Sequence, residues 1–116
     1  MSDSATTVYD KDQAPRAGSG NAALFAEMAD MFVAESETYC QALESALASG
    51  DAAALRREAH TVKSLLATFA YEAGRELALR LEQLAASGSL DGAAALTVEV
   101  VTAVRRLREA FAGESS

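Results

Sequence analysis

One histidine is the residue of this chain best suited to chemistry, and its neighbours are basic and small. His60 is the only histidine among 116 residues. Arg56 and Arg57 precede it by one helical turn, and Lys63 and Ser64 follow it by one turn. An imidazole is largely neutral and nucleophilic at neutral pH. Positive charge beside it would stabilise an anion such as a phosphoryl group, which brings about two negative charges and three acceptor oxygens.

Apolar periodicity places His60 on the solvent side of a predicted helix over residues 51–69. The predicted buried face consists of Leu55, Ala59, Val62, Leu66 and Phe69. At about 100° per residue, His60 lies on the order of 140° from the middle of that face. Ala53 and Ala67 lie two turns away on the same side as His60, so the ring is predicted to stand on a strip of small residues that another protein can approach. For Arg56, Arg57 or Lys63 taken alone, an ordinary solvated helix face is the simpler interpretation.

Four segments show the spacing of apolar residues that one buried helix face requires. They cover residues 21–48, 51–69, about 71–86 and 92–112. The predicted buried face of the first segment consists of Leu24, Phe25, Met28, Met31, Phe32, Tyr39, Leu43, Ala46 and Leu47. Glu35-Ser36 interrupts this face, which predicts a short extra N-terminal helix or a helix extension. Ser49-Gly50-Asp51 supplies a helix stop and a new N-cap. The short connections favour an all-α, antiparallel up-down four-helix bundle.

The chain is long enough for one domain. Residues 1–20 are polar and hold the only proline, so we predict a disordered lead there. The bundle is then expected over residues 21–112, followed by a short disordered tail over residues 113–116. No apolar run is long enough to span a membrane and no signal segment is recognisable, so the expected location is the cytoplasm.

The net charge and the amino-acid composition exclude several classes of function. A net charge of −7 argues against binding nucleic acid. The single Cys40 allows neither an internal disulfide nor a cysteine-based zinc site, and we expect it to be a buried, inert thiol. One outward histidine fits neither a Ser-His-Asp hydrolase nor a di-iron bundle. Neither a glycine-rich phosphate loop nor an acidic pair placed to hold a metal is recognisable, so no ATP site and no metal site are predicted.

The segment Ala59-His60-Thr61-Val62-Lys63-Ser64 resembles the signature of histidine-containing phosphotransfer (HPt) domains. That signature is Ala-His-x-(Leu/Val)-Lys-Gly, on the second long helix of a four-helix bundle. Residues 77–82 are similar to the family's Leu-x-x-x-Leu-Glu segment, and residues 43–51 to its leucine-rich helix ending in Gly-Asp. The resemblance covers roughly residues 22–112. It implies that His60 is the phosphorylated residue and that Lys63 lies beside the phosphoryl group.

Three positions depart from the family pattern. Ser64 replaces the usual glycine, but it is still small and its hydroxyl can donate a hydrogen bond to a phosphate oxygen. Leu66 stands where a small hydroxyl residue is common, and here it belongs to the apolar face. Ala70 replaces a second glycine and makes the turn after the helix less permissive.

The resemblance implies a phosphorelay carrier of two-component signal transduction, not an enzyme. It would accept a phosphoryl group from the phosphoaspartate of a receiver domain and pass it to another receiver. The expected partners are response-regulator receiver domains and a hybrid histidine kinase, with Mg²⁺ on the receiver and no cofactor on this chain. The predicted docking residues are Ala53, Arg56, Arg57, Ala67 and Tyr71. A monomer is expected, because one ring must remain accessible to a partner.

Two other interpretations of the sequence remain open at this point. One is a helical-bundle interaction module that binds and regulates a receiver or histidine kinase without being phosphorylated. The other is a structural or dimerisation bundle in which His60 is incidental.

Overall fold

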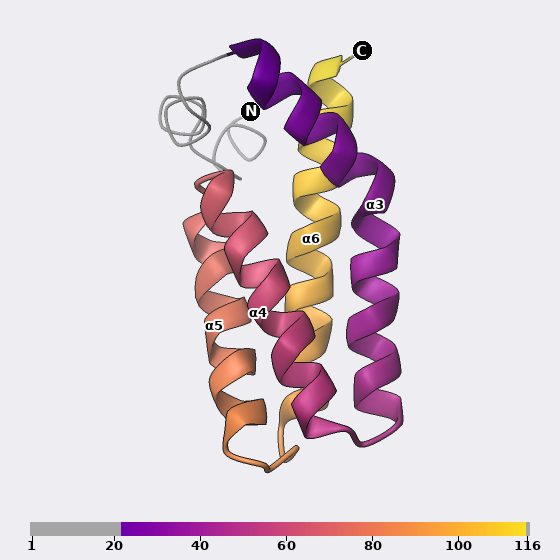
Figure 1. The fold of residues 1–116 in the computed structure, drawn as a ribbon, viewed down its shortest axis with the longest axis vertical. Helices are drawn as coiled ribbons and strands as arrows, with labels where there is room; N and C mark the ends of the chain where they lie inside the picture. Colours follow the sequence, from indigo (N-terminus) through magenta and orange to yellow (C-terminus); the bar gives the residue numbers. More distant parts are fainter. Residues whose placement is uncertain (1–21, 116) are drawn as a thin grey trace.

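Four helices run alternately down and up in the computed structural model, which describes residues 22–115 (Figure 1). They are α3 (Ala22–Ala48), α4 (Ala52–Thr68), α5 (Glu72–Ala86) and α6 (Ala93–Ser115). Helix α4 packs most extensively against α5, and α3 packs mainly against α6. The described residues contain no strand, so the predicted all-α, up-down four-helix bundle is confirmed. None of the described helices is both long enough and apolar enough to cross a membrane.

Helix α3 is one continuous helix, and the predicted break at Glu35-Ser36 does not occur. The Ser36 hydroxyl donates a hydrogen bond to the Val33 carbonyl oxygen (3.0 Å), so this buried polar group is satisfied within the helix. The prediction of a buried face was wrong for Leu24, which is exposed, and for Met31, whose exposed fraction is 63%. Both lie in the N-terminal half of α3, where the helix extends towards the end of the bundle (Figure 1).

Four phenylalanine rings hold together the end of the bundle where α4 finishes. Phe69 contacts Phe25, Phe32 and Phe111 edge-on, with ring centroids 5.7, 5.5 and 5.0 Å apart. Edge-to-face pairs of this kind add to the stabilisation that comes from burying the rings. The cluster therefore ties the C-terminal end of α4 to both α3 and α6.

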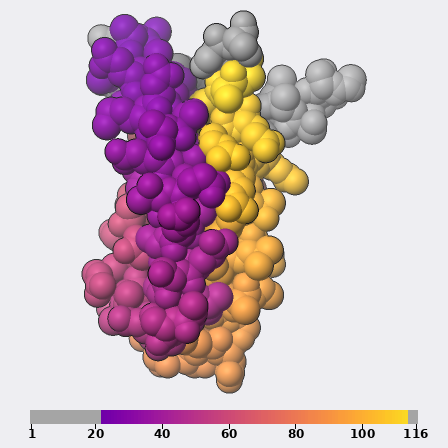
Figure 2. Space-filling model, turned by 90° about the vertical axis from the view of Figure 1, so that its right-hand side faces the viewer, coloured from indigo at the N-terminus to yellow at the C-terminus, as the bar shows by residue number. Residues whose placement is uncertain are grey.

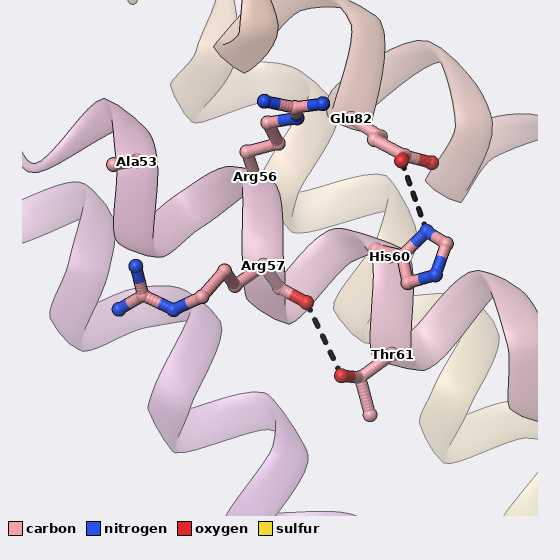
Figure 3. Close-up of a pocket in the computed structure, with 6 residues that line it drawn as sticks. All are labelled: Ala53, Arg56, Arg57, His60, Thr61 and Glu82. Carbon is pink, nitrogen blue, oxygen red and sulfur yellow. Dashed lines mark hydrogen bonds and ion pairs between the residues drawn. The ribbon is translucent and has the colours of Figure 1, made fainter.

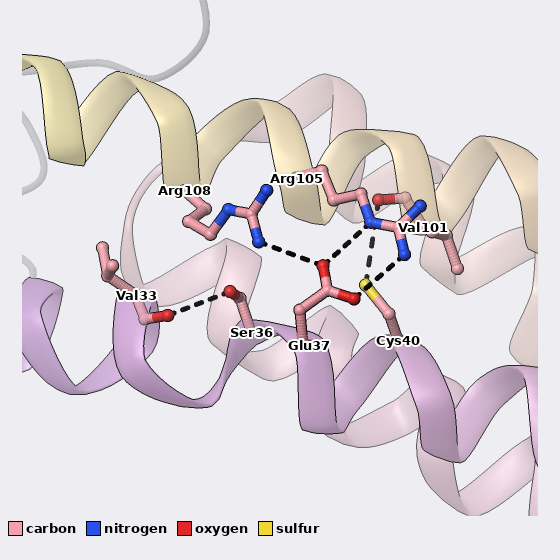
Figure 4. A network of polar contacts seen from close by, with 7 residues as sticks. All are labelled: Val33, Ser36, Glu37, Cys40, Val101, Arg105 and Arg108. Carbon is pink, nitrogen blue, oxygen red and sulfur yellow. Dashed lines mark hydrogen bonds and ion pairs between the residues drawn. The ribbon is translucent and has the colours of Figure 1, made fainter.

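An ion-pair cluster joins α3 to α6 on the far side of the core from α5. Arg105 donates two hydrogen bonds to the Glu37 carboxylate (2.9 and 3.0 Å), and Arg108 donates a third (3.0 Å; Figure 4). The hydrogen bonds from Arg105 hold the pKa of Glu37 below its usual range. Figure 2 shows α3 in indigo and α6 in yellow side by side along this seam.

Cys40 lies beside this cluster and is fully buried, as predicted. Its thiol is 4.0 Å from the Val101 carbonyl oxygen. Burial raises the pKa of the Cys40 thiol, which keeps it protonated and unreactive.

The connection between α3 and α4 forms as the sequence predicts. Gly50 has a φ of 70°, and the amide of Asp51 donates to the Ala46 carbonyl (3.1 Å), which ends α3 in a Schellman motif. The Asp51 carboxylate accepts a hydrogen bond from the Ala54 amide (3.0 Å) and caps α4. These local interactions fix where the histidine-bearing helix begins.

The predicted ends of the bundle are only partly described. Residues 1–20, predicted to be a disordered lead, lie outside the described residues, as does Asn21. The backbone of residues 113–115 continues α6 to Ser115, so the predicted disordered tail does not begin at Gly113. Ser116 lies outside the described residues.

Replacing Ala70 with glycine is expected to stabilise the domain by up to about 1 kcal/mol. Ala70 ends α4 in a second Schellman motif and has a φ of 58°, a conformation that costs residues with a Cβ. The added freedom of glycine in the unfolded chain offsets part of the gain. Urea unfolding of wild type and Ala70→Gly measures the difference.

Gly50→Ala is the matched control, because Gly50 holds the same position in the α3 motif with open space around it. It should destabilise the domain by about 1 kcal/mol. If Ala70→Gly also lowers stability, then the turn does not strain Ala70.

Candidate functional site

Helix α4 separates its core residues from His60 as the periodicity predicts. Leu55, Ala59, Val62 and Leu66 are buried. The His60 side chain is 59% exposed and lies on the opposite side of the helix. The ring is therefore held outward, where a partner can reach it.

A carboxylate from the neighbouring helix holds one edge of the His60 ring. Nδ1 of His60 is 3.0 Å from Oε2 of Glu82, which lies on α5 (Figure 3). The other carboxylate oxygen of Glu82, Oε1, is 2.8 Å from Nζ of Lys63. Glu82 therefore bridges the histidine and the lysine that lie one turn apart on α4. Its side chain is only 16% exposed, which strengthens both contacts relative to a fully solvated pair.

The contact with Glu82 fixes the tautomer of a neutral His60 ring. The close contact with Lys63, and after it the hydrogen bond with His60, hold the pKa of Glu82 below its ordinary value, so the carboxylate stays ionised. An ionised carboxylate only accepts hydrogen bonds, and Nδ1 must therefore carry the ring proton. The lone pair is then on Nε2, which Figure 3 shows on the side of the ring away from Glu82. Nε2 is therefore the ring nitrogen whose lone pair is available to a partner.

Small residues let α5 approach α4 closely enough for this contact. Gly74 and Ala78 are buried on α5, and Ala59 is buried on α4. A Cβ atom at Gly74 would lie 2.9 Å from Leu66 Cδ1 and 2.9 Å from the Tyr71 ring, which is too close for normal packing. A larger residue at position 74 would therefore displace Leu66 or the Tyr71 ring, and Glu82 lies about two turns farther along α5.

An open pocket of about 540 Å³ surrounds the exposed ring. It is lined by Ala53, Arg56, Arg57, His60, Thr61 and Glu82 (Figure 3). The two arginine side chains diverge: Arg56 extends on the side of Glu82, and Arg57 extends away from His60. The pocket therefore has two guanidinium groups in its lining besides the imidazole.

The family model for the Hpt domain matches residues 27–112. The chain belongs to the Hpt domain family. Its fold is similar to the crystal structure of histidine-containing phosphotransfer protein B (HptB) from Pseudomonas aeruginosa PAO1, with a TM-score of 0.84 and 27% sequence identity. That match covers 94% of this chain and 95% of the other chain. A search of curated proteins gives no match.

Membership of this family makes the protein a histidine phosphotransfer carrier of the phosphorelay type, not an enzyme in the usual sense. Receiver domains and histidine kinases of two-component systems are the partners that the family implies. The family assignment agrees with the resemblance carried by residues 59–64.

Most of the predicted site residues of this Hpt domain lie together on the exposed side of α4. Ala53, Arg56, Arg57, Ser64 and Ala67 are all exposed. The Ser64 hydroxyl makes no hydrogen bond within the described part of the chain, so it is available to a ligand.

Two predicted site residues of the Hpt domain have surroundings that the sequence did not predict. Tyr71, predicted to be a docking residue, is only 7% exposed and packs over Gly74, so most of its side chain is buried in the core. The Lys63 side chain is 24% exposed and paired with Glu82, so it is not on a simply solvated helix face. Its charge is already partly neutralised before any phosphoryl group arrives.

Glu82 is the site residue that the sequence analysis did not assign. The available signal was the Leu-Glu pair at the end of residues 77–82, which supported the family resemblance. Its partners lie 22 and 19 residues earlier in the chain, on another helix. Only the packing of α5 on α4 shows that this acid reaches the histidine.

Proposed function

We propose that His60 carries the phosphoryl group of a phosphorelay, accepting it from a receiver phosphoaspartate and passing it to another receiver. The observation that carries this proposal is the contact between His60 Nδ1 and Glu82 Oε2 on an outward-facing ring. It leaves Nε2 unprotonated and open to a partner. The family assignment supports the same reaction.

The transfer is an in-line displacement at phosphorus. The Nε2 lone pair forms the N–P bond as the bond between phosphorus and the aspartyl oxygen breaks, and the leaving carboxylate keeps the electron pair. The proton stays on Nδ1, where Glu82 stabilises the positive charge that develops on the ring. The reverse displacement, by the aspartate of a second receiver, regenerates the neutral histidine.

Lys63 and Ser64 are proposed to stabilise the phosphoryl group on Nε2. Lys63 is one turn from His60 and shares Glu82 with it, and Ser64 offers a free hydroxyl at the next position. Phosphoryl transfer depends on positioning and on neutralising the equatorial oxygens, to which both groups contribute. Mg²⁺ is expected from the receiver.

The receiver is proposed to dock along the exposed side of α4, over Ala53 and Ala67. A separate groove of about 170 Å³ lies between α4 and α3, and its lining includes Met31 and Leu65. Exposed apolar side chains around a concave surface are typical of protein contacts.

Transfer of label from a phosphorylated receiver tests the proposal. Receiver domains encoded in the same genome are charged with ³²P-labelled acetyl phosphate and mixed with wild type or with His60→Gln. The proposal expects acid-labile label on the wild type and none on the variant, with both proteins equally helical by circular dichroism.

Two other results would each contradict the carrier proposal. Tight receiver binding by both proteins, with label on neither, supports a regulatory interaction module. Label on both proteins would mean that the phosphorylated residue is not His60.

A further inference from the structure

We infer that Arg56 and Arg57 are specificity-determining residues that select receivers with carboxylates on the docking surface around the phosphoaspartate, apart from the carboxylates that hold Mg²⁺. This inference rests on the proposed function, since it concerns which partner brings the phosphoryl group. It assigns the two arginines a role in docking that is separate from the chemistry at Nε2. The argument comes from the charge of each helix, from the ion pairs already formed, and from the position of the two side chains.

Helix α4 is the one described helix with a positive formal charge. It carries three bases and one acid, whereas α3 carries five acids and no base. Helix α5 carries three acids and two bases, and α6 carries three of each. The whole chain has a net charge of −7. A partner with an acidic surface would therefore be repelled by most of the molecule and attracted to α4.

The positive charge of α4 is concentrated in Arg56 and Arg57. Lys63 forms an ion pair with Glu82, which offsets its charge. The remaining acid of α4, Glu58, lines a different surface, between α4 and α3. Within the described residues, neither Arg56 nor Arg57 makes an ion pair or a side-chain hydrogen bond. Two uncompensated charges thus remain beside the ring.

The arginines are placed to meet a partner that has docked on His60. Both line the pocket that contains His60; Arg56 extends on the side of Glu82, and Arg57 extends away from the ring (Figure 3). Arginine binds carboxylates through paired, parallel hydrogen bonds, which adds orientation to the attraction. Charges at the edge of an interface act mainly on the association rate and on the choice of partner. Carboxylates on the receiver surface are the complementary groups.

Charge reversal at the two arginines tests this inference. The probe is a receiver that charges the wild type and has the largest number of aspartates and glutamates around its phosphoaspartate. With subsaturating protein at low ionic strength, Arg56→Glu/Arg57→Glu is expected to slow label transfer by about 10- to 100-fold. At an ionic strength of about 0.5 M the difference from wild type should become small, because the charges are screened. Reversing to lysine the receiver carboxylates that lie on the docking surface, but not those that hold Mg²⁺, should restore the rate of the double variant.

Arg80→Glu/Arg106→Glu is the matched control. Both residues are exposed, neither lines the His60 pocket, and the change in net charge is the same. This control variant should transfer label at a rate within about threefold of the wild-type rate. An equal loss of transfer rate in the two double variants, or no loss of rate in either, would overturn the inference while leaving the carrier function intact. If no receiver charges the wild type, the proposed function itself fails.

Discussion

Glu82→Ala is expected to slow phosphoryl transfer to His60 by about 10- to 100-fold, the range found when the partner that orients a metal-ligating histidine is removed. The carboxylate keeps the proton on Nδ1 and so keeps the lone pair on Nε2. Without Glu82 the ring can rotate, and the tautomer protonated at Nε2 is unreactive. Single-turnover transfer from a labelled receiver measures the loss.

Glu82→Gln separates the hydrogen bond from the charge. The amide oxygen can still accept a hydrogen bond from Nδ1, but the amide does not attract Lys63 or stabilise a positive ring. We therefore expect a rate between those of wild type and Glu82→Ala. If Glu82→Ala transfers at the wild-type rate, the carboxylate does not set the tautomer, although His60 could still be the carrier.

Wild type and Glu82→Gln should differ in the pH dependence of their free energy of unfolding. The pKa of Glu82 is lowered in the folded state, so its contribution is fully present above the unfolded value of about 4.3 and is lost as pH falls through the lower folded value. The free energy of unfolding of wild type should therefore exceed that of Glu82→Gln at pH 6, and this difference should shrink below about pH 4. Urea unfolding at a series of pH values measures it.

The histidine-bearing helix could be predicted from the sequence because its determinants are local. Asp51 caps the helix, and the spacing from Leu55 to Phe69 fixes the buried face. Once that face is fixed, the outward direction of His60 follows from geometry alone. The Schellman motif at Gly50 is equally local, since its hydrogen bonds span five residues or fewer.

The electrostatics of the site could not be predicted in this way, because they depend on contacts between helices. The helical spacing of α4 places Lys63 on the solvent side. That spacing contains no information about Glu82, which α5 brings into contact with Lys63. The sequence places Tyr71 on the same side as His60. Because Gly74 has no side chain, the Tyr71 ring can pack inward instead. Met31 has helical spacing with the core, yet it lies in the half of α3 near the end of the bundle, where fewer helices cover it.

Ala67→Arg is expected to reduce transfer at least about 100-fold, since a misplacement of about 1 Å can cost that much. Ala67 is exposed two turns beyond His60 on the same side of α4. In-line attack requires the phosphorus to approach Nε2 to about 3–3.5 Å, so the receiver must come close to the helix. An arginine side chain on this strip would hold the receiver away. Ser64 and Ala67 are small and exposed, which is consistent with such a close approach.

Stability and position provide the controls for Ala67→Arg. Because Ala67 is exposed, the free energy of unfolding should change by no more than about 0.5 kcal/mol, so a loss of transfer would not reflect unfolding. Ala94→Arg introduces the same side chain at an exposed position of α6 and should leave the rate unchanged. A wild-type rate for Ala67→Arg would mean that the receiver approaches His60 from the N-terminal half of α4. In that case, Ala53, Arg56 and Arg57 would form its contact surface on this helix.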